Sequence, residues 1–333
     1  MHACSAVTDE LRTELTEALG RTGIPAVPVV MPTPWDIGAV TAYLFAGDPV
    51  TMVDSGVDTP EGRSALTDAL AAHGLSPADV RRVLVTHAHS DHFGGAIWLQ
   101  AESGCEVLVH EADLAMSTDP DWQETERRIF PTLGFTAEEV ERFFDGEGYE
   151  WRFPEFTPLR AGAVFVVGDA ELSVEHMPGH TPGHVWITEE RTGAIFVGDY
   201  LLANHPTNAG LERDPNHPSG RAQLLQQYNA GLRELARRDP AVLFPAHGPP
   251  ITDHRELLTR RLQKTDRRTR NVLDALRKTG VVTAVALGRR MYRDRMENWE
   301  VVADLVGRLD LLVAEGHATA RMGEDGAWRF MAT

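Results

Sequence analysis

The stretch from His87 to His92 limits what this chain can fold into more than any other part of the sequence. It reads His-Ala-His-Ser-Asp-His, so three imidazoles and one carboxylate occupy six residues. The apolar residues 83–85 come directly before it, and layered α/β folds place their ligand sites at the ends of buried strands. Several ionisable groups crowded at one strand end are hard to explain without a ligand. The pattern therefore predicts a metal site.

The composition is that of an ordinary globular protein. With 333 residues, of which 42% are hydrophobic, the chain is long enough for a full core and for two domains. No apolar run approaches the roughly 20 residues that span a bilayer, and residues 1–5 lack the basic start of a signal peptide. The two cysteines, Cys4 and Cys105, offer no disulfide framework. We therefore expect a cytoplasmic protein that makes no membrane contact.

Charge is shared unevenly between two parts of the chain. Residues 1–253 hold 38 of the 49 acidic side chains but only 16 of the 32 basic ones, and residues 254–333 carry a small basic excess. This shift in charge predicts a domain boundary near residue 250. Because an acidic body repels phosphates, we do not expect its surface as a whole to bind nucleic acid.

Short β-type runs alternate with helical patterns through the acidic part. Helices are expected over residues 60–73 and 219–239. Short, numerous strands with helices between them predict an α/β layered domain. Residues 111–162 form an excursion rich in Glu, Phe, Trp and Pro, which either borders a cleft or simply packs as a helical insertion. The expected strands cover residues 41–45, 50–53, 83–86, 107–109, 164–167, 172–176, 185–188, 194–197 and 242–244.

The chain changes character after residue 253. Residues 254–268 are expected to form a basic helical linker. Residues 269–333 then predict three helices and a hairpin whose turn lies at residues 323–326. A winged helix has the same order of elements, helices followed by a hairpin. We therefore predict a small C-terminal winged-helix-like domain. The expected organisation is thus a domain over 1–253, a linker over 254–268 and a second domain over 269–333.

Three further polar clusters lie at the ends of expected strands. Each contains glycine, which lets the backbone approach a bound ion closely. Together with residues 87–92, their order resembles that of the metallo-β-lactamase superfamily, in which HxHxDH is followed by a His, an Asp and a His. The resemblance covers residues 40–250 and implies the αββα metallo-β-lactamase sandwich, an α/β fold. The side chains of the three clusters are His180, His184, Asp199, Tyr200 and His247.

The resemblance implies a site for two divalent metal ions. One ion would be held by His87, His89 and His180. The other would be held by Asp91, His92 and His247. Asp199 would bridge the two ions. Imidazole and carboxylate without thiolate suit zinc, which we expect here, and also iron or manganese.

The same resemblance gives further residues a role near the ions. Asp91 would orient a metal-bridging hydroxide, and Asp199 would share in catalysis as the bridging ligand. Asp54 would accept a hydrogen bond from a ligand histidine and so fix the orientation of its ring. His184 either stands behind the ligands or is a structural histidine.

Differences from the family pattern narrow the choice among the branches of the superfamily. Members that hydrolyse antibiotics usually have a cysteine in the second site and no equivalent of His92, so β-lactamase activity is not expected. Lactonases carry a tyrosine three positions after the bridging aspartate, where this chain has Leu202. The sequence is most similar to the glyoxalase II and lactamase-beta-2-like branches, and the latter carries a C-terminal winged helix.

These observations predict a hydrolase that attacks an acyl carbonyl, most readily that of an acyl-CoA, acyl-carrier or glutathione thioester. A thiol with a pKa near 8.5 leaves as thiolate with little acid assistance, and no general acid is visible in the sequence. The candidate substrate contacts are Tyr200, which follows Asp199, and the cations Arg260, Arg261 and Lys264, which could meet phosphates of a carrier.

Two other functions stay open at this point. The basic helix could instead hold single-stranded RNA for phosphodiester hydrolysis, as in lactamase-beta-2-like nucleases. A non-enzymatic DNA-binding regulator is disfavoured, because the last helix carries Glu300, Asp304 and Asp310 with only Arg308 opposing them. The C-terminal domain would then pack on the body, border the site or form a homodimer.

Overall fold

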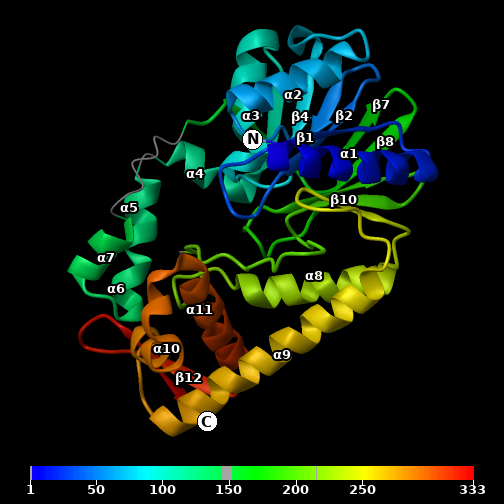
Figure 1. Cartoon of the computed structure of the whole chain (residues 1–333). Coiled ribbons are helices and arrows are strands. Elements are labelled where there is room, and N and C mark those ends of the chain that lie inside the picture. The colour runs from blue at the N-terminus through cyan, green and yellow to red at the C-terminus, as the bar shows by residue number, and fades with distance from the viewer. Residues whose placement is uncertain (1, 120, 145–151, 215) are drawn as a thin grey trace.

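The computed structural model describes residues 2–119, 121–144, 152–214 and 216–333. Two β-sheets lie face to face, and helices cover the outer side of each (Figure 1). Among the described residues, no helix is both long and apolar enough to cross a membrane. The layers are thus helix, sheet, sheet and helix, as the sequence predicts.

The first sheet has the order β1-β2-β3-β4-β5-β6. Strands β1, β2 and β3 pair antiparallel, and β3 to β6 pair parallel. Parallel strands end at the same edge of a sheet, so the loops after β3, β4 and β5 are neighbours. The strands are β1 (Val27–Met31), β2 (Val40–Phe45), β3 (Thr51–Val53), β4 (Arg82–Leu84), β5 (Glu106–His110) and β6 (Phe156–Leu159).

The second sheet has the order β11-β10-β9-β8-β7. Only β10 and β11 run parallel, and the other pairs of this described sheet are antiparallel. The ends of β10 and β11 therefore meet at one edge, where the chain continues to Asp199 and His247. The strands are β7 (Val164–Val167), β8 (Ala170–His176), β9 (Val185–Glu189), β10 (Ala194–Gly198) and β11 (Leu243–Pro245).

The core lies in three layers between these elements. Tyr43 and Phe45 of the first sheet pack on Phe196 of the second, with ring centroids 4.7 and 5.7 Å apart. Helices α2 (Pro60–Ala71) and α3 (Ser90–Ser103) bury leucine, phenylalanine and alanine on the other side of the first sheet. Helices α8 (Leu224–Arg238) and α9 (His254–Thr279) cover the second sheet. Burial of these apolar faces on folding is the main stabilising contribution.

The excursion and the C-terminal segment share one hydrophobic cluster. Phe130 and Leu133 of the excursion are fully buried in it together with Leu305 and Leu309. The excursion contains η2 (Glu111–Asp113), α4 (Ala115–Thr118), α5 (Trp122–Arg127), α6 (Ile129–Leu133) and α7 (Ala137–Phe144). The C-terminal segment continues with α10 (Ala284–Tyr292), η3 (Arg293–Glu297), α11 (Trp299–Ala314), β12 (Ala318–Met322) and β13 (Trp328–Ala332). Figure 1 shows α5 to α7 beside α10 and α11.

The helix–helix–helix–hairpin order is present at the C-terminus, and its identification as a winged helix stays a prediction. The expected linker over 254–268 forms the first half of α9, which passes the expected boundary at residues 268 and 269 without a break. Arg308 of α11 donates to the carbonyl of Thr265 and to the hydroxyl of Thr269 on this helix, at 2.9 and 3.0 Å. The long helix therefore belongs to the packing of both parts.

Several elements have no counterpart in the sequence analysis. Strands β1 and β6 are the two edges of the first sheet, and each contains a proline, Pro28 and Pro158. A proline argues against a strand in sequence but is tolerated at an edge, where its missing N–H breaks no ladder. Helix α1 (His2–Thr22) packs Leu15 and Leu19 against the core. Segment η1 (Pro77–Asp79) is a short 3₁₀ turn.

Candidate metal centre

The loop between β4 and α3 carries the first polar cluster and is anchored by Asp54. Asp54 follows β3, and its two carboxylate oxygens accept from the backbone N–H and the hydroxyl of Thr86, at 2.7 and 2.9 Å. Its own N–H donates to the carbonyl of Leu84 at 2.9 Å. Asp54 adopts the left-handed backbone conformation, with φ 56°. The buried carboxylate therefore sets the position from which residues 87–92 begin.

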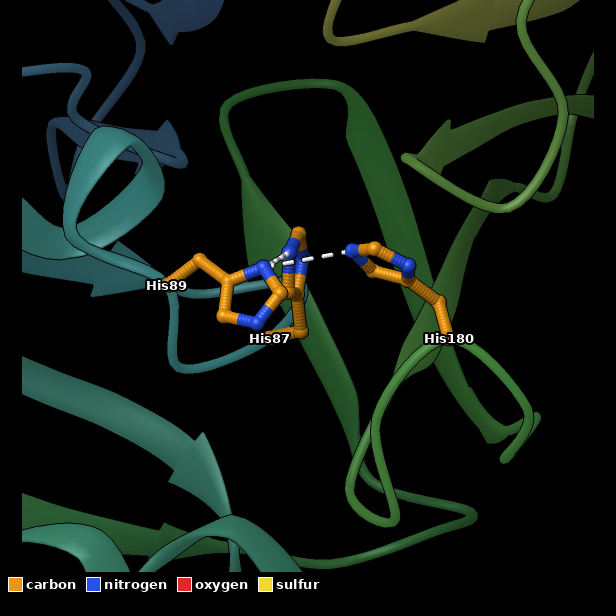
Figure 2. Close-up of side chains that lie close together, drawn as sticks. All are labelled: His87, His89 and His180. Carbon is orange, nitrogen blue, oxygen red and sulfur yellow. Dashed lines mark hydrogen bonds between the residues drawn. The ribbon is translucent and has the colours of Figure 1, made fainter. Parts of the chain in front are cut away.

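Three imidazoles converge at one end of this loop. Nδ1 of His89 lies 2.9 Å from Nε2 of His87 and 3.2 Å from Nε2 of His180. Figure 2 shows the three rings pointing toward one another, with His180 reaching across from the β8–β9 loop. Nδ1 of His180 donates to the carbonyl of Asn208 at 2.9 Å, which leaves Nε2 as the atom that faces the group. Three nitrogen atoms with this arrangement could hold one metal ion.

A second group forms beside the first. Nε2 of His247 lies 3.3 Å from one oxygen of Asp91, and Nε2 of His92 lies 3.7 Å from the other. The Nδ1 atoms point outward, where His92 donates to Asp54 and His247 donates to the carbonyl of Ala39, each at 2.9 Å. Because those bonds turn each Nδ1 outward, both Nε2 atoms face the group. These three residues could hold a second ion.

Asp199 lies between the two groups. Its Oδ2 is 3.8 Å from Nε2 of His180, and its Oδ1 is 3.6 Å from Nε2 of His92 and 3.7 Å from Nε2 of His247. Asp199 follows Gly198, which has φ 51°. A Cβ at position 198 would lie 2.6 Å from the hydroxyl oxygen of Thr86, so glycine leaves the room that Thr86 needs. Each carboxylate oxygen thus faces a different group, which is the placement that a bridging ligand requires.

The charges of the site also differ between the two groups of candidate ligands. Burial and the neighbouring His180 lower the pKa of His89 to about 3, and burial also lowers the pKa of His87. Burial acts against the charge on His92 too, but Asp54 and Asp199 raise its pKa well above the ordinary value. Burial would raise the pKa of Asp91, and the neighbouring histidines hold it at about 2. His87 and His89 are therefore neutral, whereas His92 and Asp91 are held in their charged forms.

Several atoms that face the site lack partners. Nε2 of His92, Nε2 of His247 and Oδ1 of Asp199 are buried and make no hydrogen bond within the described part of the chain. Buried polar atoms without a partner are uncommon and point to a ligand that completes them. The five imidazoles and two carboxylates fit zinc, iron or manganese. The residues present therefore fit a site for divalent metal.

His184 stands beside the group and does not join it. Its ring stacks on that of His87, with centroids 5.0 Å apart and an interplanar angle of 23°. The side chain is fully buried, and burial lowers its pKa well below the ordinary value. His184 thus supports a ligand histidine by packing, as a neutral ring.

Asp113 is a site residue that the sequence analysis missed. One of its oxygens accepts from the N–H of Ala88 at 3.0 Å and from the hydroxyl of Thr181 at 2.8 Å. The other accepts from the N–H of Gly183. The carboxylate thus ties the loop of His87 and His89 to the loop of His180. Its place shortly after β5, the parallel neighbour of β4, is the signal that could have found it.

A cavity of about 650 Å³ opens onto the seven candidate ligands His87, His89, Asp91, His92, His180, Asp199 and His247, which we call the metal-ligand group. His89, His180 and Asp199 lie at its inner end. Its outer wall comes from the excursion, the loop after Asp199 and α11, so the excursion does border a cleft. We use "outer wall" for the aromatic residues Trp122, Phe143, Phe144 and Trp299 and the glutamates Glu124, Glu126, Glu212 and Glu300.

The structure contradicts one predicted substrate contact, Tyr200. Its side chain is fully buried, and its hydroxyl lies 3.2 to 3.3 Å from the carbonyls of Pro178, Gln227 and Tyr228. Its ring packs on those of Trp186 and His184. Tyr200 is next to Asp199 in the chain, but its side chain points into the core instead of the cavity. The prediction from sequence adjacency is therefore wrong.

The basic residues of α9 also lie outside the lining of the cavity. Arg260 is exposed and pairs with Glu256 at 3.0 Å. Arg261 donates to the carbonyls of Leu202 and His205 and so holds the loop after Asp199. Lys264 lies with Arg261 in a separate hollow of about 40 Å³. These cations support the surrounding chain and do not line the path to the metal-ligand group.

Comparisons with known proteins agree with this architecture. Residues 35–247 match the family model described as Metallo-beta-lactamase superfamily. The chain is 31% identical over 305 residues to a probable metallo-hydrolase, YqjP, of Bacillus subtilis (strain 168), which covers 88% of this chain and 94% of the relative. An atrochrysone carboxyl ACP thioesterase of Aspergillus fumigatus is 26% identical over 240 residues, covering 72% of this chain and 44% of the relative.

Solved structures with the same fold superpose on nearly the whole chain. A metallo-beta-lactamase family protein from Thermus thermophilus superposes with a TM-score of 0.74 and 25% identity, covering 93% of this chain and 99% of that one. A beta-lactamase domain protein from Burkholderia ambifaria gives a TM-score of 0.76 at 23% identity, covering 93% and 92%. The likeness therefore extends beyond the family model into the C-terminal segment.

Proposed function

The chain belongs to the metallo-beta-lactamase superfamily and is a metallo-hydrolase, and we propose that it hydrolyses thioesters with two divalent metal ions. His87, His89 and His180 would hold one ion. Asp91, His92 and His247 would hold the other, and Asp199 would bridge them. The observation that carries this proposal is the position of Asp199, whose two oxygens face different groups.

Bound divalent ions would lower the pKa of a water molecule toward neutrality and polarise the acyl oxygen, and zinc is the ion we expect. The protein's own residues prepare the site for them. Asp54 and the carbonyls of Ala39 and Asn208 accept from Nδ1 of His92, His247 and His180, so each ring presents its Nε2 to the site as the ligand atom. Asp91 and Asp199 would orient the attacking water, because their pKa values are low and they stay ionised at neutral pH.

The thioester class is supported by the leaving group and by the cavity. Because a thiolate leaves with little acid assistance, the reaction needs no general acid at the inner end of the cavity. The residues that line this end are His89, His180 and Asp199. Beside its glutamates the cavity is lined by aromatic and aliphatic side chains, such as Ile37, Leu202 and Leu211, which fit an acyl chain. Relatives named as ACP thioesterases support the same class, although they are distant in sequence.

Phosphodiester hydrolysis of RNA is disfavoured by the charges around the cavity. Four glutamates and one arginine, Arg127, lie in the lining away from the metal-ligand group. Such a wall repels a phosphate backbone. The cations of α9 that could offset it make contacts elsewhere, as with Arg260 and Arg261.

The test measures metal content and turnover in one preparation. We expect about two metal ions per chain by elemental analysis, and hydrolysis of an acyl thioester that is lost with a chelator and restored by zinc. A panel of acyl-CoA, S-lactoylglutathione, homoserine lactone, cephalosporin and short RNA should show turnover of thioesters alone. Cleavage of RNA that weakens steeply with salt, without thioester hydrolysis, would overturn the assignment.

A further inference from the structure

Two glutamates of the outer wall are placed in a way that the metal chemistry does not explain. Glu126 on α5 is 8% exposed, and its Oε1 accepts only a long hydrogen bond of 3.4 Å from the N–H of Arg213. Its Oε2 is buried and makes no hydrogen bond among the residues that the structure describes. Glu212 lines the same cavity from the loop after Asp199. A buried carboxyl oxygen without a partner is costly and is usually completed by a ligand.

The two carboxyl groups also oppose each other's charge. Burial raises the pKa of Glu126 to about 7, and the neighbouring Arg213 offsets only part of the effect. Burial raises the pKa of Glu212 well above its ordinary value, and the charges of Asp113 and Glu126 raise it further. Like charges in a poorly solvated site stay ionised only when a cation joins them.

The nearby arginines do not supply that cation. Arg127 also lines the cavity, but its guanidinium lies 4.9 Å from the ring centroid of Phe144 and 3.6 Å from Glu141. Arg213 is exposed. The remaining charged groups of the wall, Glu124 and Glu300, are acidic as well. Away from the metal-ligand group, the described residues of the lining therefore hold four carboxyl groups and one guanidinium, Arg127, which is engaged by Phe144 and Glu141.

Aromatic rings surround the same space. Trp122, Phe143 and Trp299 line the cavity, as does Phe144, whose ring already meets the guanidinium of Arg127. The ring of Phe143 lies 6.0 Å from that of Phe144 and 6.3 Å from that of Trp299, and neither pair is stacked. Aromatic faces attract organic cations, and they do so most strongly in a desolvated site. Carboxylates and aromatic rings together are the groups that bind a quaternary ammonium.

We propose that the cavity selects acyl groups that carry a positive charge, with Glu126 and Glu212 as the specificity-determining residues. The inference rests on the proposed thioester hydrolysis and names its substrate class. A quaternary ammonium in the cavity has no N–H to donate, so it would pair with Oε2 of Glu126 by charge and offset the repulsion between the two carboxylates. An acyl group that ends in a carboxylate would add a third negative charge and be rejected.

Three matched thioesters of N-acetylcysteamine test the order of preference. Their acyl groups are trimethylammoniobutanoyl, its neutral isostere dimethylhexanoyl, and glutaryl, on one neutral leaving group. We expect kcat/KM for the cationic thioester to exceed that of the neutral one by about tenfold or more, with the anionic one lowest. Equal rates, or a preference for the neutral or anionic group, would overturn the inference while leaving thioester hydrolysis intact.

Two substitutions assign the preference to the named carboxyls. E126Q and E212Q keep the side-chain shape and remove the charge, and each should shrink the ratio of cationic to neutral kcat/KM by about tenfold. E138Q is the matched control, because Glu138 is an exposed residue of α7 that pairs with Arg142 at 4.0 Å, and the ratio should not change. A ratio unchanged in both cavity variants would contradict the assignment.

The pH dependence gives a measure that needs no variant. The ratio of cationic to neutral kcat/KM should rise as pH increases through about 7, where Glu126 ionises. Taking the ratio cancels the pH dependence of the metal chemistry, since both substrates use it. A ratio that stays flat across this range would count against Glu126.

Binding of the matching amides separates the two proposals. The amides of N-acetylethylenediamine carry the same acyl groups and resist hydrolysis, so calorimetry reports selectivity without turnover. Tighter binding of the cationic amide with no turnover of any thioester would overturn the proposed function and keep the selectivity. Turnover of all three thioesters with no order in amide binding would overturn the selectivity alone.

Discussion

The metal-ligand group and the outer wall of the cavity meet in one site but are built differently. Each of the seven candidate ligands lies shortly after a strand of one of the two sheets, and hydrogen bonds to Asp54 and Asp113 hold the two loops that carry residues 87–92 and His180. The outer wall comes from short helices of the excursion and from α11, which share a separate hydrophobic cluster. The chemistry and the choice of substrate therefore depend on different parts of the fold. Substitutions in one part should leave the property of the other unchanged.

The largest expected effect comes from removing the residue between the two groups. Asp199→Ala should reduce thioester turnover to background and lower the metal content below two ions per chain, because both groups lose the oxygen that faces them. Asp169→Ala, in the exposed turn between β7 and β8, is the control. Full activity of the Asp199 variant would remove its bridging assignment.

A smaller loss is expected when a ligand histidine loses its support. In Asp54→Asn, one carboxylate oxygen becomes an NH2 group that cannot accept, so either the backbone N–H of Thr86 or Nδ1–H of His92 loses its acceptor and the support of the His92 ring weakens. Metal affinity or activity should fall by about 10- to 100-fold. Competition with a fluorescent chelator measures the affinity. An unchanged affinity for both ions would show that Asp54 serves the loop alone.

Metal uptake should also depend on pH in a fixed direction. Carboxylates raise the pKa values of His92 and His247, so these rings hold protons that a metal must displace. Affinity for the second ion should therefore increase with pH, by up to about tenfold per unit for each displaced proton. Calorimetry in buffers of different ionisation enthalpy counts the released protons. Uptake without proton release would contradict the assigned pKa directions.

A change in the outer wall should affect substrate choice while the metal centre stays intact. Trp299→Ala opens the wall at α11, so KM for a bulky acyl thioester should rise by about tenfold while the acetyl thioester is unaffected. Steady-state kinetics with both substrates measures the split, and elemental analysis should still find two ions. An equal loss for both substrates would mean that the wall and the metal centre are coupled.

The smallest effect is expected at Tyr200. Tyr200→Phe removes a hydroxyl that faces three backbone carbonyls, which should lower the free energy of unfolding by about 1 kcal/mol. Kinetic constants should not change, because the side chain is fully buried away from the cavity. Chemical denaturation measures the loss. A raised KM would restore Tyr200 as a substrate contact.

The parts of the fold that the sequence predicts well are those with a local signal. Central strands such as β2, β4 and β10 are rich in buried apolar residues, and their predicted bounds agree with the structure to within one or two residues. The edge strands β1 and β6 escape prediction, because their prolines conceal a pairing that only the neighbouring strand reveals. Charge alone separates residues 254–268 from the residues that follow, and a change of charge does not end a helix.

The side chains that could gather as metal ligands can be identified from residue order alone, because each follows a strand and strand ends of a layered α/β fold lie together. What surrounds these side chains depends on the packing of the whole chain. This packing placed Asp113 between two ligand loops, buried Tyr200, and joined the excursion to α11 to make the cavity. These contacts join residues far apart in the chain, so they depend on how whole elements pack, and no local pattern of residue types encodes that packing.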